Sequence, residues 1–294
     1  MKNDIPKSIP IKKIIVENPF VKTFVFEHRL NSKPGQFVNL WLPRVDEKPM
    51  SIAYDGGDEF WVSMFAVGNF SKKMHTLEVG DLVGVRGPYG KPFTFEQNQR
   101  LVMVGGGYGA APLYHLALKA VDQGCSVDFI VGARGNDYLL YLDRIRALKN
   151  TVLHVATDDG SVGEKGYNTL ILERVIAEVK NKELGIGNKG ENQSHDSLFT
   201  IPNSGLCSID CVYTCGPEMM MKRVSDICFE AGVRAQISVE RYMKCGFGVC
   251  GQCTVDPDGQ RMCMEGPCVS NERARKILEF GKYHRDAMGK VHQI

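Results

Sequence analysis

The stretch Leu101-Val-Met-Val-Gly-Gly-Gly-Tyr-Gly-Ala-Ala-Pro112 lies near the middle of the 294-residue chain and decides its fold class. An apolar run precedes a glycine-rich turn, and apolar residues recur at helical spacing after it. A turn of this kind between a strand and a helix presents amide N–H groups and the positive end of the helix dipole, which favour a pyrophosphate. The candidate nucleotide contacts are Gly105, Gly106, Gly107 and Gly109.

The segments that follow this turn alternate between strand-like and helix-like patterns. Strands are predicted over 126–131, 152–156 and 211–214, and helices over 139–148, 169–179 and 219–230. Such alternation is typical of a parallel, doubly wound sheet, so residues 99–234 are predicted to form an α/β nucleotide-binding domain. Residues 184–209 are polar and glycine-rich, and we interpret them as an insertion that forms a surface loop or is disordered.

Two further segments follow strands of this sheet, at the edge where ligands bind in open α/β sheets. Cys215-Gly216-Pro217-Glu218 comes after one strand and Asp158 after another. The first segment also fits a buried thiol before a helix with proline in its first turn, and the second fits an ordinary polar turn. Combined with the glycine turn, they make Asp158, Cys215, Gly216 and Pro217 candidate walls of a nicotinamide site. The simple dinucleotide fingerprint is not met, because Gly132-Ala-Arg134 stands where an acidic residue is expected.

Residues 1–98 have the pattern of a small antiparallel β-barrel. Segments 21–26, 36–42 and 60–65 carry β-branched and aromatic residues with partial alternation, and glycine-containing turns separate them. Lys48-Pro49-Met50-Ser51 closes one strand region, where a cation and a hydroxyl could contact the pyrophosphate and ring edge of a flavin. A charge beside a proline also fits a solvated turn.

The C-terminal part contains Cys245-Gly-Phe-Gly-Val-Cys250-Gly-Gln-Cys253, followed by Cys263. C-x4-C-x2-C with a later fourth cysteine is the plant-ferredoxin spacing for a [2Fe–2S] cluster. Glycines inside the loop permit left-handed backbone and close approach to a cluster. A zinc site and thiol or disulfide chemistry remain as alternatives. We expect residues 235–294 to form a small iron–sulfur domain whose tail, 272–285, has helix potential.

Composition excludes several classes of protein. The formal net charge of +2 gives no indication of nucleic acid or an anionic membrane as a partner. The longest apolar stretch, 101–118, is interrupted by glycines and a proline, so no membrane span is predicted. The N-terminus lacks the apolar core of a signal peptide, and ten cysteines without an export signal indicate a reducing cytoplasm.

The order of these motifs resembles the ferredoxin-NAD(P)⁺ reductase superfamily with a fused [2Fe–2S] domain. More narrowly, the chain is similar to the electron-transfer subunits of B-type dihydroorotate dehydrogenases. The most specific stretch runs from Glu240-Arg-Tyr-Met-Lys-Cys245 through Cys263-Met-Glu-Gly-Pro267. In that family the cysteine before the acidic-Gly-Pro segment is the fourth ligand, which implies Cys245, Cys250, Cys253 and Cys263 as ligands and leaves Cys268 outside the cluster.

The resemblance also implies FAD in the barrel and NAD on the sheet. The usual Arg-Pro-x-Ser corresponds to Lys48, Pro49, Met50 and Ser51, where lysine keeps the charge but loses the bidentate fork. A second flavin segment often ends in Gly-x-Gly-Thr after an arginine. Here the arginine is absent, Phe70 replaces glycine and Ser71 replaces threonine. The implied contacts of this segment are Met64, Phe65, Gly68, Phe70 and Ser71.

The function implied by the resemblance is electron transfer in pyrimidine biosynthesis. An FMN-containing catalytic subunit oxidises dihydroorotate, and electrons pass through the cluster and FAD to NAD⁺ within a hetero-oligomer, expected to be a heterotetramer. No residue of this chain is predicted to be catalytic toward dihydroorotate. Two alternatives stay open: a diaphorase-like subunit of a cytoplasmic hydrogenase or anaerobic sulfite reductase, and a zinc-stapled binding or redox-sensing module.

Overall fold

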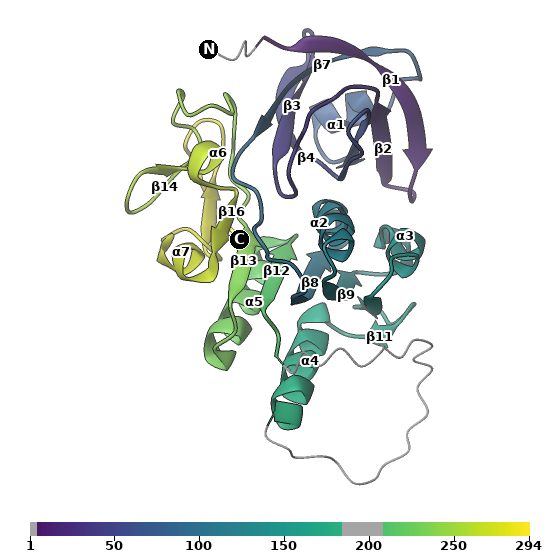
Figure 1. Ribbon diagram of the computed structural model, residues 1–294. Helices are drawn as coiled ribbons and strands as arrows, with labels where there is room; N and C mark the ends of the chain where they lie inside the picture. The colour runs from purple at the N-terminus through teal and green to yellow at the C-terminus, as the bar shows by residue number, and fades with distance from the viewer. Residues whose placement is uncertain (1–4, 184–207) are drawn as a thin grey trace.

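The computed structural model describes residues 5–183 and 208–294, which form three parts in mutual contact. Figure 1 shows the N-terminal barrel above a layered α/β part, with the C-terminal part packed along one side of both. Most of the predicted insertion, 184–209, lies outside the described residues. In the part of the chain that is described, no helix has the length and apolar character needed to cross a bilayer.

The N-terminal part is one curled antiparallel sheet of seven strands in the order β4-β3-β7-β1-β2-β6-β5. Phenylalanines and aliphatic residues fill its interior, with Phe24, Phe26 and Phe60 completely buried. Alternating burial along β6 follows from side chains that point to opposite faces. The elements are β1 (Lys7–Val16), β2 (Val21–Phe26), β3 (Phe37–Leu42), β4 (Asp46–Ser51), β5 (Tyr54–Asp55), β6 (Phe60–Phe65), α1 (Asn69–Met74) and β7 (Leu82–Tyr89).

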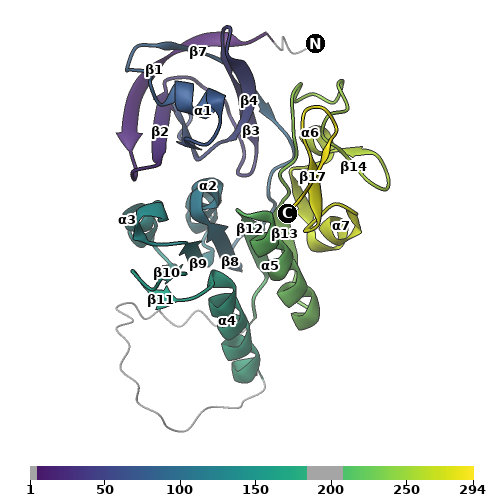
Figure 2. The same cartoon turned by 180° about the vertical axis from the view of Figure 1, so that it is seen from behind.

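The middle part is the doubly wound sheet predicted from the sequence. Its strands run in the order β11-β10-β9-β8-β12-β13-β16, and all pair in parallel except β16, which is antiparallel to β13. Helices α2 and α3 pack on one face, and α4 and α5 pack on the other, as Figures 1 and 2 show. The strands are β8 (Arg100–Gly106), β9 (Ser126–Ala133), β10 (Thr151–Thr157), β11 (Glu164–Lys165), β12 (Cys211–Cys215), β13 (Ala235–Ser238) and β16 (Cys268–Ser270). The helices are the 3-10 turns η1 (Gly107–Gly109) and η2 (Asn136–Tyr138), then α2 (Ala110–Asp122), α3 (Leu142–Arg146), α4 (Asn168–Glu183) and α5 (Glu218–Ala231).

The C-terminal part is small and shares strands with the sheet. It contains β14 (Thr254–Val255), β15 (Gln260–Arg261), α6 (Met262–Glu265), α7 (Asn271–Lys276), β17 (Tyr283–Arg285) and β18 (Val291–Gln293). β13 follows the predicted boundary at residue 235 and pairs with β12, so the sheet continues past that boundary. One apolar cluster joins Phe37 of the barrel, Met221 of α5 and the buried Cys253 and Cys263.

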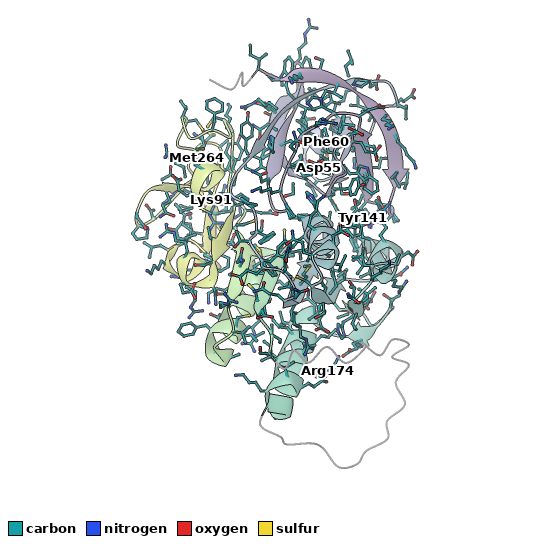
Figure 3. All side chains as sticks on the ribbon, viewed as in Figure 1. Asp55, Phe60, Lys91, Tyr141, Arg174 and Met264 are labelled. Atoms are coloured by element: carbon teal, nitrogen blue, oxygen red, sulfur yellow. The ribbon has the colours of Figure 1, made fainter. Side chains whose placement is uncertain are left out.

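Two predicted helices are wrong in extent. The helix predicted over 139–148 is only α3, because Tyr141 adopts a left-handed backbone (φ 67°) and turns its buried ring toward the barrel. Its hydroxyl lies 2.5 Å from that of Ser63, at the junction of the two parts where Figure 3 labels it. The tail predicted as helix over 272–285 forms α7, and its last residues pair instead in the β17–β18 hairpin.

Candidate cofactor sites

A cavity of about 630 Å³ opens where the barrel, the glycine turn and the segment before the cysteine loop meet. The barrel contributes β4, β6 and the start of α1, and the sheet contributes the turn after β8 and the end of β12. All of the flavin contacts predicted from the sequence line this cavity: Lys48, Pro49, Met50, Ser51, Met64, Phe65, Gly68, Phe70 and Ser71. The exposed Val67 and the half-exposed Tyr108 also face it, which is apolar surface that a flat ring would cover.

Lys48 places a cation at the rim of this cavity. Its ammonium lies 2.8 Å from the Asp46 carboxylate and 5.1 Å from the centre of the Tyr242 ring. Burial lowers the pKa of Lys48, but the hydrogen bond to Asp46 and the electrostatic interactions with Tyr242 and Asp46 outweigh it, so the net pKa is raised. The side chain therefore stays charged and can neutralise a phosphate, although Asp46 already offsets part of that charge.

Ser71 shapes the turn before α1. Its hydroxyl accepts hydrogen bonds from the amides of Val67 and Gly68, at 3.0 Å each, and donates to the Gly68 carbonyl. These bonds fix the backbone that forms one wall of the cavity. The hydroxyl predicted to contact flavin is thus already used by the local loop.

Tyr108 and Glu240 are cavity residues that the sequence reasoning did not select. Glu240 reaches solvent through the cavity, while protein surrounds its other sides. Burial and the nearby Glu218 carboxylate raise the pKa of Glu240 to about 7, although the Tyr108 hydroxyl donates a hydrogen bond to it. An aromatic residue inside the glycine turn and an acid five residues before the first cysteine were the available signals.

The glycine turn and the Cys215–Pro217 segment pack directly against each other at the carboxyl edge of the sheet. A Cβ on Gly109 would lie 2.2 Å from the Cys215 carbonyl oxygen, and one on Gly216 would lie 2.9 Å from Gly106 backbone atoms. Both positions therefore require glycine. Gly107 has a positive φ of 52° and open space beside it, which leaves room for a ligand over the turn. The structure thus joins two of the predicted nicotinamide walls.

The other predicted nucleotide residues lie at different depths. Gly105 is buried within β8, and its carbonyl accepts a hydrogen bond of 3.1 Å from the Asn168 side chain. Asp158 is exposed at the same edge, just beyond β10, and its amide donates to the Ala133 carbonyl. Because β9 separates β10 from β8, Asp158 borders the site at a distance from the glycine turn.

The cysteine loop curls as a cluster requires. Gly246, Gly248 and Gly251 all have φ between 72° and 85°. A Cβ on Gly248 would lie 2.8 Å from the Met264 side chain, so this position needs glycine for space as well as for backbone conformation. The Val249 amide points at the Cys245 sulfur at 3.4 Å, and the Cys263 amide points at the Cys253 sulfur at 3.3 Å. Such donors stabilise thiolates and the sulfurs of a cluster.

The four predicted ligands form two pairs. The Cys245 thiol interacts with Cys250, and the Cys253 thiol interacts with Cys263. Burial raises the pKa of Cys245, but loop amides outweigh it and bring the pKa to about 7, while hydrogen bonding to Cys263 lowers the pKa of Cys253 to about 6. In the described residues no three His, Cys, Asp or Glu side chains gather closely enough to hold a single metal ion. Two pairs of thiolates are what two bridged irons need.

Two family models match the chain. Residues 240–274 match the iron-sulfur cluster binding domain of dihydroorotate dehydrogenase B, and residues 103–226 match an oxidoreductase NAD-binding domain. Curated relatives carry the name "Probable dihydroorotate dehydrogenase B (NAD(+)), electron transfer subunit". The one from Methanocaldococcus jannaschii is 42% identical over 280 residues, or 95% of each chain. The chain belongs to this electron transfer subunit family.

A second curated relative agrees with this family, and two solved structures agree with the fold. The relative of the same name from Methanothermobacter thermautotrophicus is 40% identical over 98% of this chain and 97% of its own. A solved NADH-dependent reduced ferredoxin-NADP oxidoreductase superposes with a TM-score of 0.71 at 26% identity, covering 93% of this chain and 90% of that one. The FAD/NAD-binding domain of a Vibrio cholerae nitric oxide dioxygenase shares the fold, with a TM-score of 0.60 at 18% identity over 78% of this chain and 94% of its own.

These findings confirm the family resemblance, the three-part fold class and the cofactor classes FAD, [2Fe–2S] and NAD. They decide for iron–sulfur over the zinc and disulfide interpretations, and they do not favour the hydrogenase or sulfite reductase alternative. The assignment of individual residues to each cofactor stays a prediction, as does the exact division into domains.

Proposed function

We propose that this chain is the electron transfer subunit of a dihydroorotate dehydrogenase B and links the partner's oxidation of dihydroorotate to NAD⁺ in pyrimidine biosynthesis. One observation carries the proposal: the three predicted cofactor sites are adjacent in a single chain. The glycine turn of the nucleotide edge forms part of the wall of the flavin-sized cavity, and one apolar cluster joins Phe37 of that wall to the cysteine pair Cys253 and Cys263. When bound, FAD exchanges electron pairs with a nicotinamide and single electrons with a [2Fe–2S] cluster.

The chain's own residues bind and orient these groups. Lys48 neutralises phosphate, and Met50, Phe65 and Tyr108 cover the flavin's apolar surface in the cavity. The glycine turn presents amides at the start of α2 to the pyrophosphate of NAD. Cys245 and Cys250 hold one iron, while Cys253 and Cys263 hold the other.

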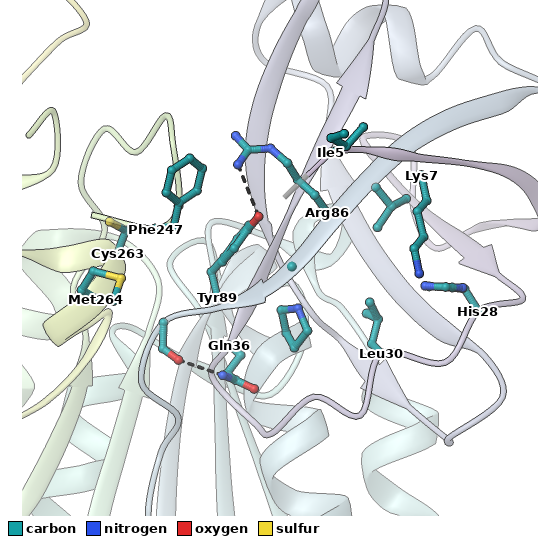
Figure 4. Close-up of a pocket in the computed structure, with 15 residues that line it drawn as sticks. Ile5, Lys7, His28, Leu30, Gln36, Arg86, Tyr89, Phe247, Cys263 and Met264 are labelled. Carbon is teal, nitrogen blue, oxygen red and sulfur yellow. Dashed lines mark hydrogen bonds between the residues drawn. The ribbon is translucent and has the colours of Figure 1, made fainter. Parts of the chain in front are cut away.

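The partner's docking face surrounds the cysteine loop. Phe247, Val249 and Met264 expose 39%, 77% and 44% of their surface beside the predicted ligands. Phe247 and Met264 also border a groove of about 550 Å³ between this loop and the barrel, shown in Figure 4. An electron carrier must approach its partner through the face that carries the cluster, so the occupant we propose is an FMN-containing catalytic subunit. The assembly is a heterotetramer.

The compartment that we propose is the cytoplasm. None of the nine described cysteines is in a disulfide, which fits the reducing environment of the cytoplasm.

The test is native anaerobic purification of the tagged chain from its source cells, followed by identification of co-eluting proteins and assay of dihydroorotate-dependent NAD⁺ reduction. The expected result is co-elution of the catalytic subunit and turnover that needs both chains. Val249→Asp is expected to release the partner while iron and flavin remain bound. Recovery of hydrogenase or sulfite reductase subunits in place of the dehydrogenase would overturn the proposal.

A further inference from the structure

Arg86 lies near the end of β7, where the barrel faces the cysteine loop. Its side chain is only 8% exposed, although it carries a full charge. It lines the groove beside the loop but belongs neither to the flavin cavity nor to the predicted cluster ligands, so contact with a cofactor does not explain why a buried guanidinium is placed here. Figure 4 shows it reaching over Tyr89 toward Phe247 of the loop.

On one side, the guanidinium holds the backbone that leads into the cluster. Nη1 donates to the carbonyl of Cys245, the first predicted ligand, and Nη2 donates to the Lys244 carbonyl at 3.1 Å. The side chain of Asn39, which is paired with Arg86 across β3 and β7, donates to the same Lys244 carbonyl at 2.8 Å. Two barrel residues therefore fix the entry of the cysteine loop.

On the other side, the guanidinium is paired with Glu47 of β4. Nε contacts one carboxylate oxygen, and Nη2 donates to the other at 2.8 Å. Glu47 directly precedes Lys48 and the strand segment that lines the flavin cavity. One rigid planar group thus connects the flavin-binding strand to the backbone of a cluster ligand.

Two aromatic rings also lie close to the guanidinium of Arg86. The guanidinium carbon lies 5.6 Å from the centre of the Tyr89 ring and 5.5 Å from that of Phe247. Contacts with two rings and hydrogen bonds in two separate directions suit arginine, whose donors have a fixed fork, and a lysine cannot make all of them at once.

We propose that Arg86 is a positioning residue that fixes the cysteine loop against the flavin-binding strand and whose charge raises the reduction potential of the cluster. This inference rests on the proposed function. Reduction adds negative charge to the cluster, and a nearby buried cation stabilises that state because little solvent screens it. Glu47 opposes the effect, so the two members of the ion pair act on the potential in opposite directions.

The experiment is a redox titration of the holoprotein under anaerobic conditions, in which the EPR signal of the reduced cluster is followed in wild type, Arg86→Gln and Glu47→Gln. Iron, sulfide and flavin are quantified in each. Arg86→Gln is expected to lower the ratio of reduced to oxidised cluster at a fixed potential by about 3- to 10-fold, and Glu47→Gln to raise it. Arg29→Gln removes an exposed guanidinium paired with Asp58 and serves as the matched control, with no shift expected.

Arg86→Lys separates position from charge. It should leave the potential close to that of wild type but slow reduction of the cluster by NADH about 10-fold, since the two loop carbonyls lose their fixed donors. Equal potentials and equal rates in all variants would overturn the role of Arg86, as would shifts of the same sign in Arg86→Gln and Glu47→Gln. A wild-type protein without an iron–sulfur signal would overturn the proposed function itself and the role of Arg86 with it.

Discussion

The cysteine loop and the flavin cavity prepare for their cofactors by opposite means. The loop is one continuous segment from Cys245 to Cys253, and its glycines and amides turn toward the sulfurs, of which that of Cys250 is exposed and that of Cys253 is buried. The cavity is built from segments that lie far apart in the chain, and its thiol, Cys215, is only 2% exposed, with a pKa raised by burial and by the Glu240 carboxylate. Amide donors around a thiol favour the thiolate that binds metal, whereas burial without such donors keeps a thiol protonated and unreactive.

The largest expected effect separates two buried cysteines that lie five residues apart. Cys263→Ser should lose nearly all of the iron, because one iron would keep only a single strong ligand. Cys268→Ser should keep its iron, because that thiol points at the barrel, 3.6 Å from the Gly35 carbonyl oxygen, and belongs to neither cysteine pair. Iron and sulfide analysis after anaerobic reconstitution measures both. Equal iron loss in the two variants would mean that the loop does not end at Cys263.

The difference between the exposed loop thiol of Cys250 and the buried thiol of Cys215 also predicts how fast each reacts with an alkylating reagent. In cluster-free protein at pH 7, we expect iodoacetamide to modify the exposed Cys250 at least about 100-fold faster than Cys215. Peptide mapping by mass spectrometry over a time course gives both rates from one sample. Comparable rates would show that Cys215 is open to solvent and that the two regions do not differ as described.

Within the flavin cavity, we expect the charge of Lys48 to have a moderate effect on the affinity for FAD. Lys48→Ala should weaken FAD binding about 10-fold, since a charge-assisted contact is lost and the Asp46 carboxylate is left without its cation. Lys48→Arg restores the cation and is the control. Fluorescence titration of flavin-free protein measures the affinity, and an unchanged value for the alanine variant would remove Lys48 from the phosphate site.

The smallest expected effect concerns Glu240. Its pKa of about 7 means that its charge changes between pH 6 and pH 8. Below that pH the carboxyl is neutral, and above it a negative charge faces the cavity. Because bound flavin replaces water around this group and FAD is itself an anion, the affinity should be about 3-fold weaker at pH 8 than at pH 6. Glu240→Gln should flatten this dependence. A slope that persists in the variant would assign the pH effect to another group.

Much of the fold could be predicted because local patterns determine it. β2 and β6 begin and end at the predicted residues, since alternating β-branched and aromatic side chains fit a half-buried sheet. The prediction over 139–148 failed because tertiary packing of Tyr141 against Ser63 overrides helix propensity.

The candidate site residues also differ in whether a local sequence pattern predicts them. Cysteine spacing is a local signal, so all four candidate ligands could be predicted from the sequence, and the structure brings them together in two pairs. The contacts of Glu240, Tyr108 and Arg86 join parts of the chain that are distant in sequence. A local pattern could mark Tyr108 or Glu240 as unusual, but it could not show which residues they meet. The Arg86–Cys245 bond, for example, spans 159 residues.

The most direct test of the account is an anaerobic titration of the purified holoprotein with NADH, in which visible absorption reports the flavin and EPR reports the cluster in the same sample. If this chain connects a nicotinamide edge, a flavin cavity and a cluster loop, both signals must change, with one electron appearing on the cluster of each chain. Flavin that is reduced while the cluster stays oxidised, or a protein that binds neither group, would contradict the account.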